Sequence, residues 1–321
     1  TKPNAVQTHV TCFGINNGSI TTSITGGIPF TTGNPYIISW SGPNGFISSN
    51  SNINSLEPGI YSLTITDAGG CPISNNFTIT EPTDISITTD INSNVTCFGS
   101  DNGEIAITVT GGTGIYVYTW TKNGFPFSNN QDLANLSPGN YVVSVTDANN
   151  CGPKTSTFII TEPPILAVSL VNQVNVDCYD TSTGSITINT VGGTVATNYT
   201  FSWIGPNGFT SSNQNLTNLF SGIYNLTVTD DLGCSKNLSV NLTQSTEILI
   251  NVVTTPIVCY GDNNATIAVT LSGGNPPYQI QWSNLATGLN QINLAPDNYT
   301  ITVTDNLGCQ KAMTINIPSP P

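Results

Sequence analysis

The chain has 321 residues, of which only 7% are charged, and its formal net charge is -13 at pH 7. All five basic residues are lysines, so the sequence offers no basic patch for phosphate, and nucleic-acid binding is excluded as a function class. An anionic membrane surface would repel the chain, and no apolar run approaches the ~18 residues of a membrane-spanning helix. We therefore expect neither a nucleic-acid partner nor direct membrane insertion.

One set of landmarks recurs four times along the chain. The tryptophans show the period of the repeat, because they lie about 80 residues apart, at Trp40, Trp120, Trp203 and Trp282. A period this long, holding a full set of strand and turn signals, predicts a tandem array of small domains, which usually sets distance, stiffness and valency. The predicted domains are 1–83, 84–164, 165–246 and 247–321.

In the first copy, a Gly- and Asn-rich turn follows Cys12 and leads into a segment in which Ile20 and Ile24 alternate with polar residues. This period of two predicts a half-buried strand, which the pair Gly26-Gly27 ends. The next predicted strand carries Trp40. We expect the four equivalent tryptophans to form the centres of sandwich cores, as in immunoglobulin-like domains.

A Leu-x-Pro-Gly-x-Tyr landmark follows and precedes another strand in each copy. The tyrosines sit where a tyrosine corner would place its hydroxyl against nearby backbone: Tyr61, Tyr141, Tyr224 and Tyr299. Each strand ends at an Asp and a short turn, and a last strand leads into the next copy, with Glu-Pro at Glu81 and Glu162 marking two junctions. About seven short strands per copy predict an all-β fold, a tandem array of four immunoglobulin-like β-sandwich modules forming an elongated rod.

Eight cysteines, two per copy at matching places, indicate disulfides and an oxidising compartment. Buried free thiols are the alternative. The spacing does not suit zinc, because no CxxC pair occurs and His9 is the only histidine.

The pairing of these cysteines has two candidate schemes. Pairing within a copy, such as Cys12 to Cys71, requires loops at opposite ends of a sandwich to meet, although strand length separates them by roughly 25–35 Å and a disulfide needs Cα atoms within about 7 Å. In a linear array the first loop of one copy faces the second loop of the next. We therefore favour cross-module bonds, with Cys71 and Cys259 left for neighbouring repeats or chains. The favoured bonds are Cys12–Cys151, Cys97–Cys234 and Cys178–Cys309.

Four aspartates at the ends of these strands are weak calcium candidates: Asp67, Asp147, Asp230 and Asp305. One carboxylate per loop is too few for a tight calcium site, and an Asp that caps its own turn is the favoured interpretation. A Ser-His-Asp arrangement is not available to the later copies, since His9 is the single histidine and is expected at the surface. The sequence thus predicts no catalytic residue, no cofactor and no essential metal.

The landmarks together resemble the SprB repeat, a module of gliding-motility and adhesin proteins on the surface of Bacteroidetes bacteria. The matching motifs are VTCFG-x3-GSI, the TGG turn, the PY…W strand and the L-x-P-G-x-Y-x3-VTD-x-x-GC ending. The third copy departs most, with Tyr199-Thr-Phe in place of Pro-Tyr and no closing Glu-Pro. The resemblance implies a long secreted adhesin, exported by the type IX system and moved along the cell by a gliding motor.

The leading hypothesis is a non-catalytic, extracellular structural region, the stalk of a cell-surface adhesin or the body of a filament. Its partners would be neighbouring repeats or copies of the same protein, and surface polysaccharide is a further candidate. One alternative is a glycan-binding array that uses aromatics of the Asn-Gly-Phe turns, namely Phe46, Phe125 and Phe209. Another is an accessory region of a larger secreted hydrolase.

Overall fold

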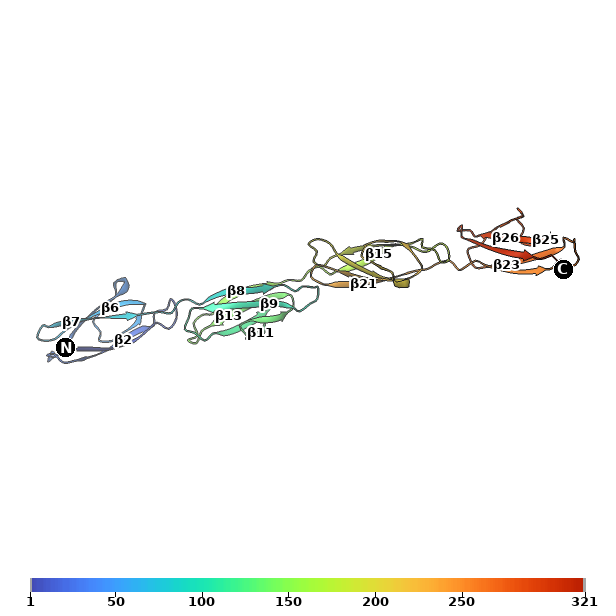
Figure 1. Cartoon of the computed structure of the whole chain (residues 1–321). Helices are drawn as coiled ribbons and strands as arrows, with labels where there is room; N and C mark the ends of the chain where they lie inside the picture. Colours follow the sequence, from blue (N-terminus) through green and yellow to red (C-terminus); the bar gives the residue numbers. More distant parts are fainter. Residues whose placement is uncertain (1, 320–321) are drawn as a thin grey trace. The chain divides into compact units, whose positions relative to one another are not determined.

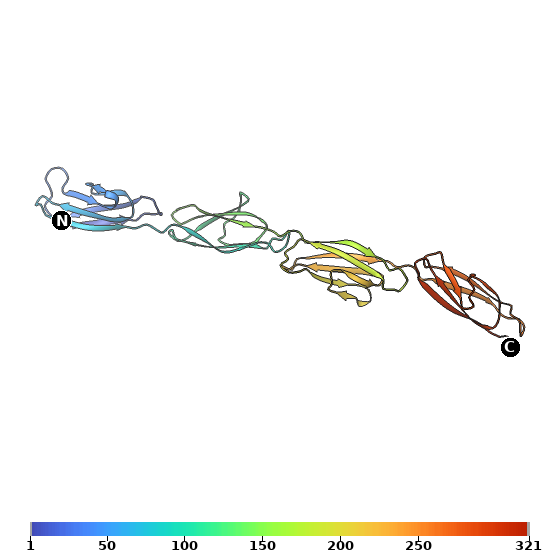
Figure 2. The same cartoon turned by 90° about the horizontal axis from the view of Figure 1, so that it is seen from above.

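The computed structural model describes residues 2–319, and within that range the regular elements are β-strands and two short 3-10 turns (Figures 1 and 2). The chain divides into two compact units, Thr1–Glu162 and Pro163–Pro321. Each unit holds two β-sandwiches. We letter the strands of a sandwich A, B, C, C′, E, F and G in chain order.

The first sandwich packs the sheet β1-β2-β5 (strands A, B and E) against the sheet β4-β3-β6-β7 (C′, C, F and G). All neighbouring strands are antiparallel. This seven-stranded arrangement is the immunoglobulin-like sandwich expected from the sequence. Its elements are β1 (Lys2–Thr8), β2 (Gly18–Thr25), β3 (Ile37–Ser41), η1 (Pro43–Gly45), β4 (Ile47–Ser48), β5 (Ile53–Leu56), β6 (Gly59–Thr66) and β7 (Pro72–Ile79).

The second sandwich repeats this order with the sheets β12-β9-β8 and β11-β10-β13-β14. Its strands are β8 (Ser86–Ser93), β9 (Gly103–Thr110), β10 (Val117–Lys122), β11 (Phe125–Ser128), β12 (Leu133–Leu136), β13 (Gly139–Thr146) and β14 (Lys154–Ile160).

The second unit holds the third and fourth sandwiches. The third has the sheets β15-β16-β19 and β18-β17-β20-β21, whereas the fourth has β22-β23-β25 and the shorter sheet β24-β26-β27, which lacks strand C′. The third consists of β15 (Ala167–Val174), β16 (Gly184–Val191), β17 (Thr200–Ile204), η2 (Pro206–Gly208), β18 (Thr210–Ser211), β19 (Leu216–Leu219), β20 (Gly222–Thr229) and β21 (Ser235–Leu242). The fourth consists of β22 (Leu249–Thr255), β23 (Ala265–Ser272), β24 (Gln279–Trp282), β25 (Gln291–Leu294), β26 (Asp297–Thr304) and β27 (Gln310–Ile317).

Each sandwich has its own apolar core around a tryptophan. In the second sandwich Trp120 is fully buried, its ring centroid lies 5.6 Å from that of Phe158, and its Nε1 donates to the carbonyl oxygen of Asn130 at 2.8 Å. The N–H of a buried indole usually finds an acceptor, because leaving it unpaired would offset part of the gain from burying the ring. The other three tryptophans are 1% exposed and donate to backbone carbonyls in the same way: Trp40, Trp203 and Trp282.

The tyrosines of the Leu-x-Pro-Gly-x-Tyr landmark form tyrosine corners. The Tyr141 hydroxyl donates to the carbonyl oxygen of Ser137, four residues earlier, at 2.8 Å. The corresponding bonds in the other sandwiches, again over four residues, measure 3.0, 2.9 and 3.1 Å for Tyr61, Tyr224 and Tyr299. Burial raises the pKa of both Tyr61 and Tyr224 above the ordinary value of a tyrosine. These hydroxyls therefore stay protonated at neutral pH and can act as donors.

The domain boundaries placed at 83/84, 164/165 and 246/247 fall in segments between the last strand of one sandwich and the first strand of the next. The segments are 80–85, 161–166 and 243–248, and we call them linkers. Strands A and B are joined by the A–B turns (9–17, 94–102, 175–183 and 256–264), and strands F and G are joined by the F–G turns (67–71, 147–153, 230–234 and 305–309).

Candidate functional site: the junctions between sandwiches

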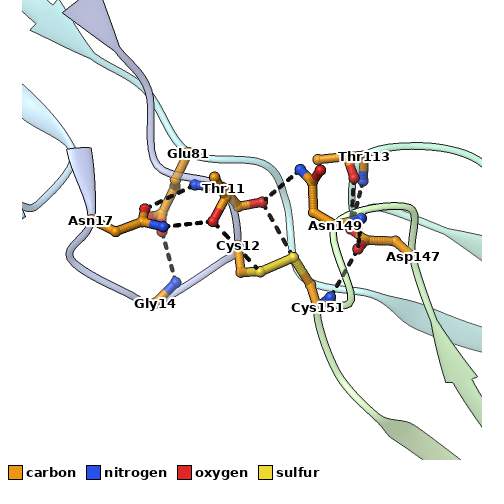
Figure 3. The surroundings of a disulfide bond; sticks show 9 residues. All are labelled: Thr11, Cys12, Gly14, Asn17, Glu81, Thr113, Asp147, Asn149 and Cys151. Atoms are coloured by element: carbon orange, nitrogen blue, oxygen red, sulfur yellow. Dashed lines mark hydrogen bonds between the residues drawn. A yellow bond between two sulfur atoms is a disulfide. The ribbon is translucent and has the colours of Figure 1, made fainter. Parts of the chain in front are cut away.

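A disulfide joins two sandwiches within the first unit (Figure 3). Cys12, in the first A–B turn, is bonded to Cys151, in the second F–G turn, with a Cα–Cα distance of 5.4 Å. Cys151 is 7% exposed, and Cys12 packs against the core of the second sandwich. Across the same junction the Asn149 Nδ2 donates to the carbonyl oxygen of Thr11 at 3.3 Å. The bond thus lies in a packed contact rather than bridging an open gap.

The second unit contains the same arrangement. Cys178, in the third A–B turn, is bonded to Cys309, in the fourth F–G turn, again with a Cα–Cα distance of 5.4 Å. Cys309 is 8% exposed, its Sγ lies 3.6 Å from the carbonyl oxygen of Asp177, and Cys178 packs against the core of the fourth sandwich. The contact is therefore a property of the repeat and not of one pair of sandwiches.

The aspartate of each F–G turn holds that turn in shape. One carboxylate oxygen of Asp147 accepts from the backbone N–H of Asn149 and of Cys151, both at 2.9 Å, and the other accepts from the N–H and hydroxyl of Thr113, also at 2.9 Å (Figure 3). Asp67, Asp230 and Asp305 make the matching backbone contacts in their own sandwiches. These are the contacts of an aspartate that caps its own turn.

Hydrogen bonding decides the ionisation of these carboxyls. Burial raises the pKa of Asp147 and is the largest single effect, but the donors on Cys151, Thr113 and Asn149 together lower it below its ordinary value. The same balance lowers the pKa of Asp305, while for Asp67 the N–H of Cys71 is the largest cause of a lowered pKa. The carboxylates of Asp67, Asp147 and Asp305 are thus ionised at neutral pH, which is the state that accepts these bonds.

The Gly-Gly pair after strand B is a docking place for the incoming linker. Gly112 donates its N–H to the carbonyl oxygen of Thr83 at 2.8 Å. A Cβ on Gly111 would lie 2.0 Å from the carbonyl oxygen of Asp84, and one on Gly112 would lie 2.7 Å from the Asp147 carboxylate. Only glycine permits both approaches, and Gly192-Gly193 and Gly273-Gly274 make the same contacts in the second unit.

The linker glutamates clamp the A–B turns, a role that the sequence interpretation missed. Glu81 accepts from the N–H of Gly14 at 2.8 Å, and Glu162 accepts from the N–H of Gly99 at 2.9 Å. In the third sandwich, which lacks Glu-Pro, Gln244 takes the place of the glutamate and accepts from the N–H of Asp180 at 3.0 Å. The signal was present, since an acidic or amide residue recurs at this place, but it was interpreted only as a junction marker.

Ion pairs between a linker and the next strand G were also not foreseen. Lys154 contacts Asp84 at 2.8 Å and Lys311 contacts Glu247 at 2.8 Å. The Lys154 ammonium lowers the pKa of Asp84, and the Glu247 carboxylate raises the pKa of Lys311. Because these side chains are about half exposed, solvent screens both ion pairs, and neither pair adds much to stability.

Two cysteines remain as free thiols, Cys71 in the first F–G turn and Cys259 in the fourth A–B turn, and both are exposed. Cys97 lies in the second A–B turn and Cys234 in the third F–G turn. Their pairing, which would join the two units, stays a prediction.

The aromatics proposed for glycan binding differ in their surroundings. The rings of Phe46 and Phe209 pack edge-on against the tyrosines of their own corners, with centroids 5.3 Å apart, whereas Phe125 is 75% exposed. Two of the three phenylalanines thus pack against the corner tyrosine of their own sandwich.

His9 accepts from the N–H of Thr80 at 3.1 Å and so ties the first A–B turn to the linker.

A family model for the SprB repeat matches the chain four times, at residues 4–45, 89–125, 170–208 and 251–287. Each match begins in or beside strand A and covers the first half of one sandwich. The chain therefore belongs to the SprB-repeat family, as its motifs indicated. Four repeats of this kind, folded as tandem immunoglobulin-like sandwiches, support a structural repeat region of a cell-surface protein, and the disulfides fit an extracellular location.

Other similarities are more distant. The decoration protein of Escherichia phage T5 is 34% identical over 67 residues, which cover 19% of this chain and 41% of that protein, so the chain spans less than half of that relative. Among solved structures, the three N-terminal domains of the Highly Immunogenic Outer Capsid protein of bacteriophage RB49 align with a TM-score of 0.37 at 11% identity, covering 100% of this chain and 98% of that one. Sidekick-1 immunoglobulin domains 1–5 align with a TM-score of 0.29 at 12% identity, covering 93% and 75%. The fold assignment itself comes from the strand order.

No helix in the described part of the chain is long and apolar enough to cross a membrane.

Proposed function

We propose that this chain is a non-catalytic, load-bearing stalk, the repeat region of a secreted bacterial adhesin or extracellular filament. The observation that carries the proposal is the disulfide between the A–B turn of one sandwich and the F–G turn of the next, which occurs in both units. Surface attachment and gliding motility are the processes that such a stalk would serve, as the family suggests.

We call the Cys12–Cys151 and Cys178–Cys309 disulfides staples. They shorten the covalent path that tension must follow. A force applied at the two ends passes along strand A of the first sandwich to Cys12, crosses to Cys151, and continues along the backbone to Cys178 before crossing to Cys309. Cys178 lies 27 positions after Cys151, and the segment that joins them contains β14 and β15, which are already extended. At about 3.5 Å per residue this segment reaches only about 95 Å when taut.

Most of each sandwich is then shielded from the load. Without staples, the 297 positions from Cys12 to Cys309 could extend to about 1,000 Å. With the staples in place, most residues of each sandwich lie outside the covalent path that bears the force. Unfolding of a sandwich therefore cannot lengthen the chain by the full length of that sandwich. A thread exposed to drag gains resistance to lengthening without any increase in the stability of its domains.

Single-molecule pulling between the chain ends tests this function. The protein used carries Cys71→Ser and Cys259→Ser, so that the free thiols cannot cross-link molecules. Under oxidising conditions we expect no domain-sized unfolding steps. With a reducing agent present we expect up to four steps of about 220 Å, one for each unfolded sandwich of about 75 residues.

Domain-sized steps of the same number and length before and after reduction would contradict the proposal, because the staples would then carry no load. A variant that also carries Cys12→Ser and Cys151→Ser is the matched control, since it should lengthen in oxidising buffer while the staple of the second unit stays closed.

A further inference from the structure

We propose that Cys71 and Cys259 are the two halves of one further junction, so that a second copy of this chain joins head to tail through a Cys259–Cys71 disulfide. This inference rests on the stapled stalk proposed above and names its partner. It is carried by a comparison within the molecule, because the equivalents of both cysteines are seen bonded in the two staples.

The half that bears Cys71 is already formed. Asp67 accepts from the N–H of Gly69 at 3.0 Å, of Cys71 at 3.2 Å and of Ile28 at 3.2 Å, the contacts that shape the F–G turns of the stapled sandwiches.

This half lacks a side-chain donor, because Gly69 stands where Asn149 reaches across the stapled junction. The staple of the second unit shows that the donor is dispensable, since Leu307 stands at the same place and Cys309 is bonded all the same. What the two stapled F–G turns share with the first is the aspartate-capped turn that presents the cysteine.

The half that bears Cys259 presents an uncovered apolar face. Its turn is closed by the N–H of Asp262, which donates to the carbonyl oxygen of Cys259 at 3.1 Å, as that of Thr181 does to Cys178 at 3.4 Å. Tyr260 is 87% exposed and Val258 is 76% exposed. The aromatics that follow the stapled A–B cysteines are less exposed, Phe13 at 54% and Tyr179 at 47%.

The comparison with the two staples also shows which kinds of turn should pair. In both staples an A–B cysteine meets an F–G cysteine, and the residue before the A–B cysteine points its carbonyl oxygen at the F–G sulfur, at 3.2 Å from Cys151 and 3.6 Å from Cys309. Cys259 brings such a carbonyl and the aromatic that follows it; Cys71 brings the turn that covers them. Two F–G turns or two A–B turns placed together would lack one of these parts.

The bond forms by thiol–disulfide exchange with glutathione disulfide as the oxidant. The Cys259 thiolate attacks one glutathione sulfur and releases the first glutathione thiolate. The Cys71 thiolate of the second copy then attacks the sulfur of Cys259 in the mixed disulfide and releases the second. Two protein thiols are oxidised, and one glutathione disulfide is reduced to two glutathione molecules.

The test uses two variants of the full chain, Cys71→Ser and Cys259→Ser, incubated in a glutathione redox buffer alone and mixed, then analysed by non-reducing electrophoresis and peptide mapping. Each variant alone should remain monomeric. The mixture should give a dimer linked through Cys71 and Cys259, with hetero- over homodimer exceeding the statistical ratio by about tenfold or more, which corresponds to about 1.4 kcal/mol of preferential contact. Adding Tyr260→Ala to the Cys71→Ser variant should lower that yield severalfold.

Homodimers of either variant at the statistical ratio would overturn the proposal, and so would the absence of any cross-link. Labelling by a small aromatic disulfide shows beforehand that each remaining thiol is accessible, so a missing cross-link cannot be ascribed to burial. The same peptide map reports the Cys12–Cys151 peptide. Its presence without a cross-linked dimer refutes the head-to-tail junction alone, and its absence refutes the stapled stalk.

Discussion

The F–G aspartates show how much one residue determines in each repeat. The Asp147 carboxylate closes its own turn, holds the N–H of Cys151 and reaches across to Thr113 in the B–C loop. It thereby fixes the direction in which the cysteine leaves the sandwich. Sequence reasoning reached the turn-capping role from the position of the Asp before a Gly- or Asn-rich turn, but the reach to Thr113 depends on a contact 34 residues away.

Replacement of Asp147 by Asn tests this role. The amide keeps one acceptor oxygen and loses the other, and so leaves either Thr113 or the N–H groups of Asn149 and Cys151 without an acceptor. We expect the free energy of unfolding to fall by about 1–3 kcal/mol, measured by denaturant titration followed by tryptophan fluorescence. Asp101→Asn is the matched control in the same sandwich, because Asp101 is exposed, and it should leave stability nearly unchanged. Equal effects of the two substitutions would show that the charge matters and the turn does not.

We expect low pH to reduce the stability of the sandwiches. Folding lowers the pKa of Asp67, Asp147 and Asp305 below the value of ~3.9 of an unfolded chain. The stabilisation is therefore complete above that value and is lost as the pH falls through the lower, folded pKa. Melting temperatures should be flat from pH 7 to about 5 and fall below about 4. A melting temperature that rises on acidification would contradict the assignment.

At the scale of elements, the strands and their core residues could be predicted because their signals are local. Alternation in strands B and F, the tryptophan in strand C and the tyrosine at the start of strand F each lie within one short segment that recurs four times. The clamps by Glu81 and Glu162 and the ion pair of Asp84 with Lys154 could not, because they join the linker to turns and strands more than 60 residues away in the sequence. A repeated pattern identifies an element, but only the fold identifies its contacts.

The fourth sandwich should be the first to open. Its sheet β24-β26-β27 has no strand C′, and Tyr299 is 8% exposed where the other corner tyrosines are at most 1% exposed. Fewer strands and a less covered corner lower the free energy of local opening. Hydrogen exchange of the full chain, followed by mass spectrometry, should show β26 exchanging faster than its equivalents β6, β13 and β20. Slower exchange in β26 than in those strands would contradict this order.

At the scale of the whole molecule, the rod stays a prediction from the sequence. Junctions of only a few residues, two of which carry proline, leave little room for folding back. We therefore expect a rod with a maximum dimension on the order of 140–160 Å, from four modules of roughly 35–40 Å. Small-angle scattering measures this dimension, and a compact particle under half that length would rule out the rod.

The pairing of the cysteines is the claim on which the stalk depends. Loop closure over the 139 positions from Cys12 to Cys151 should also stabilise the native state by about 2–5 kcal/mol, so the staples matter to stability as well as to load. Which cysteines are joined in the native protein is answered most directly by proteolysis without reduction, followed by mass spectrometry of the linked peptides. We predict peptides linked through Cys12–Cys151, Cys97–Cys234 and Cys178–Cys309, with Cys71 and Cys259 free in the isolated monomer. Recovery of a peptide linking Cys12 to Cys71 would contradict it.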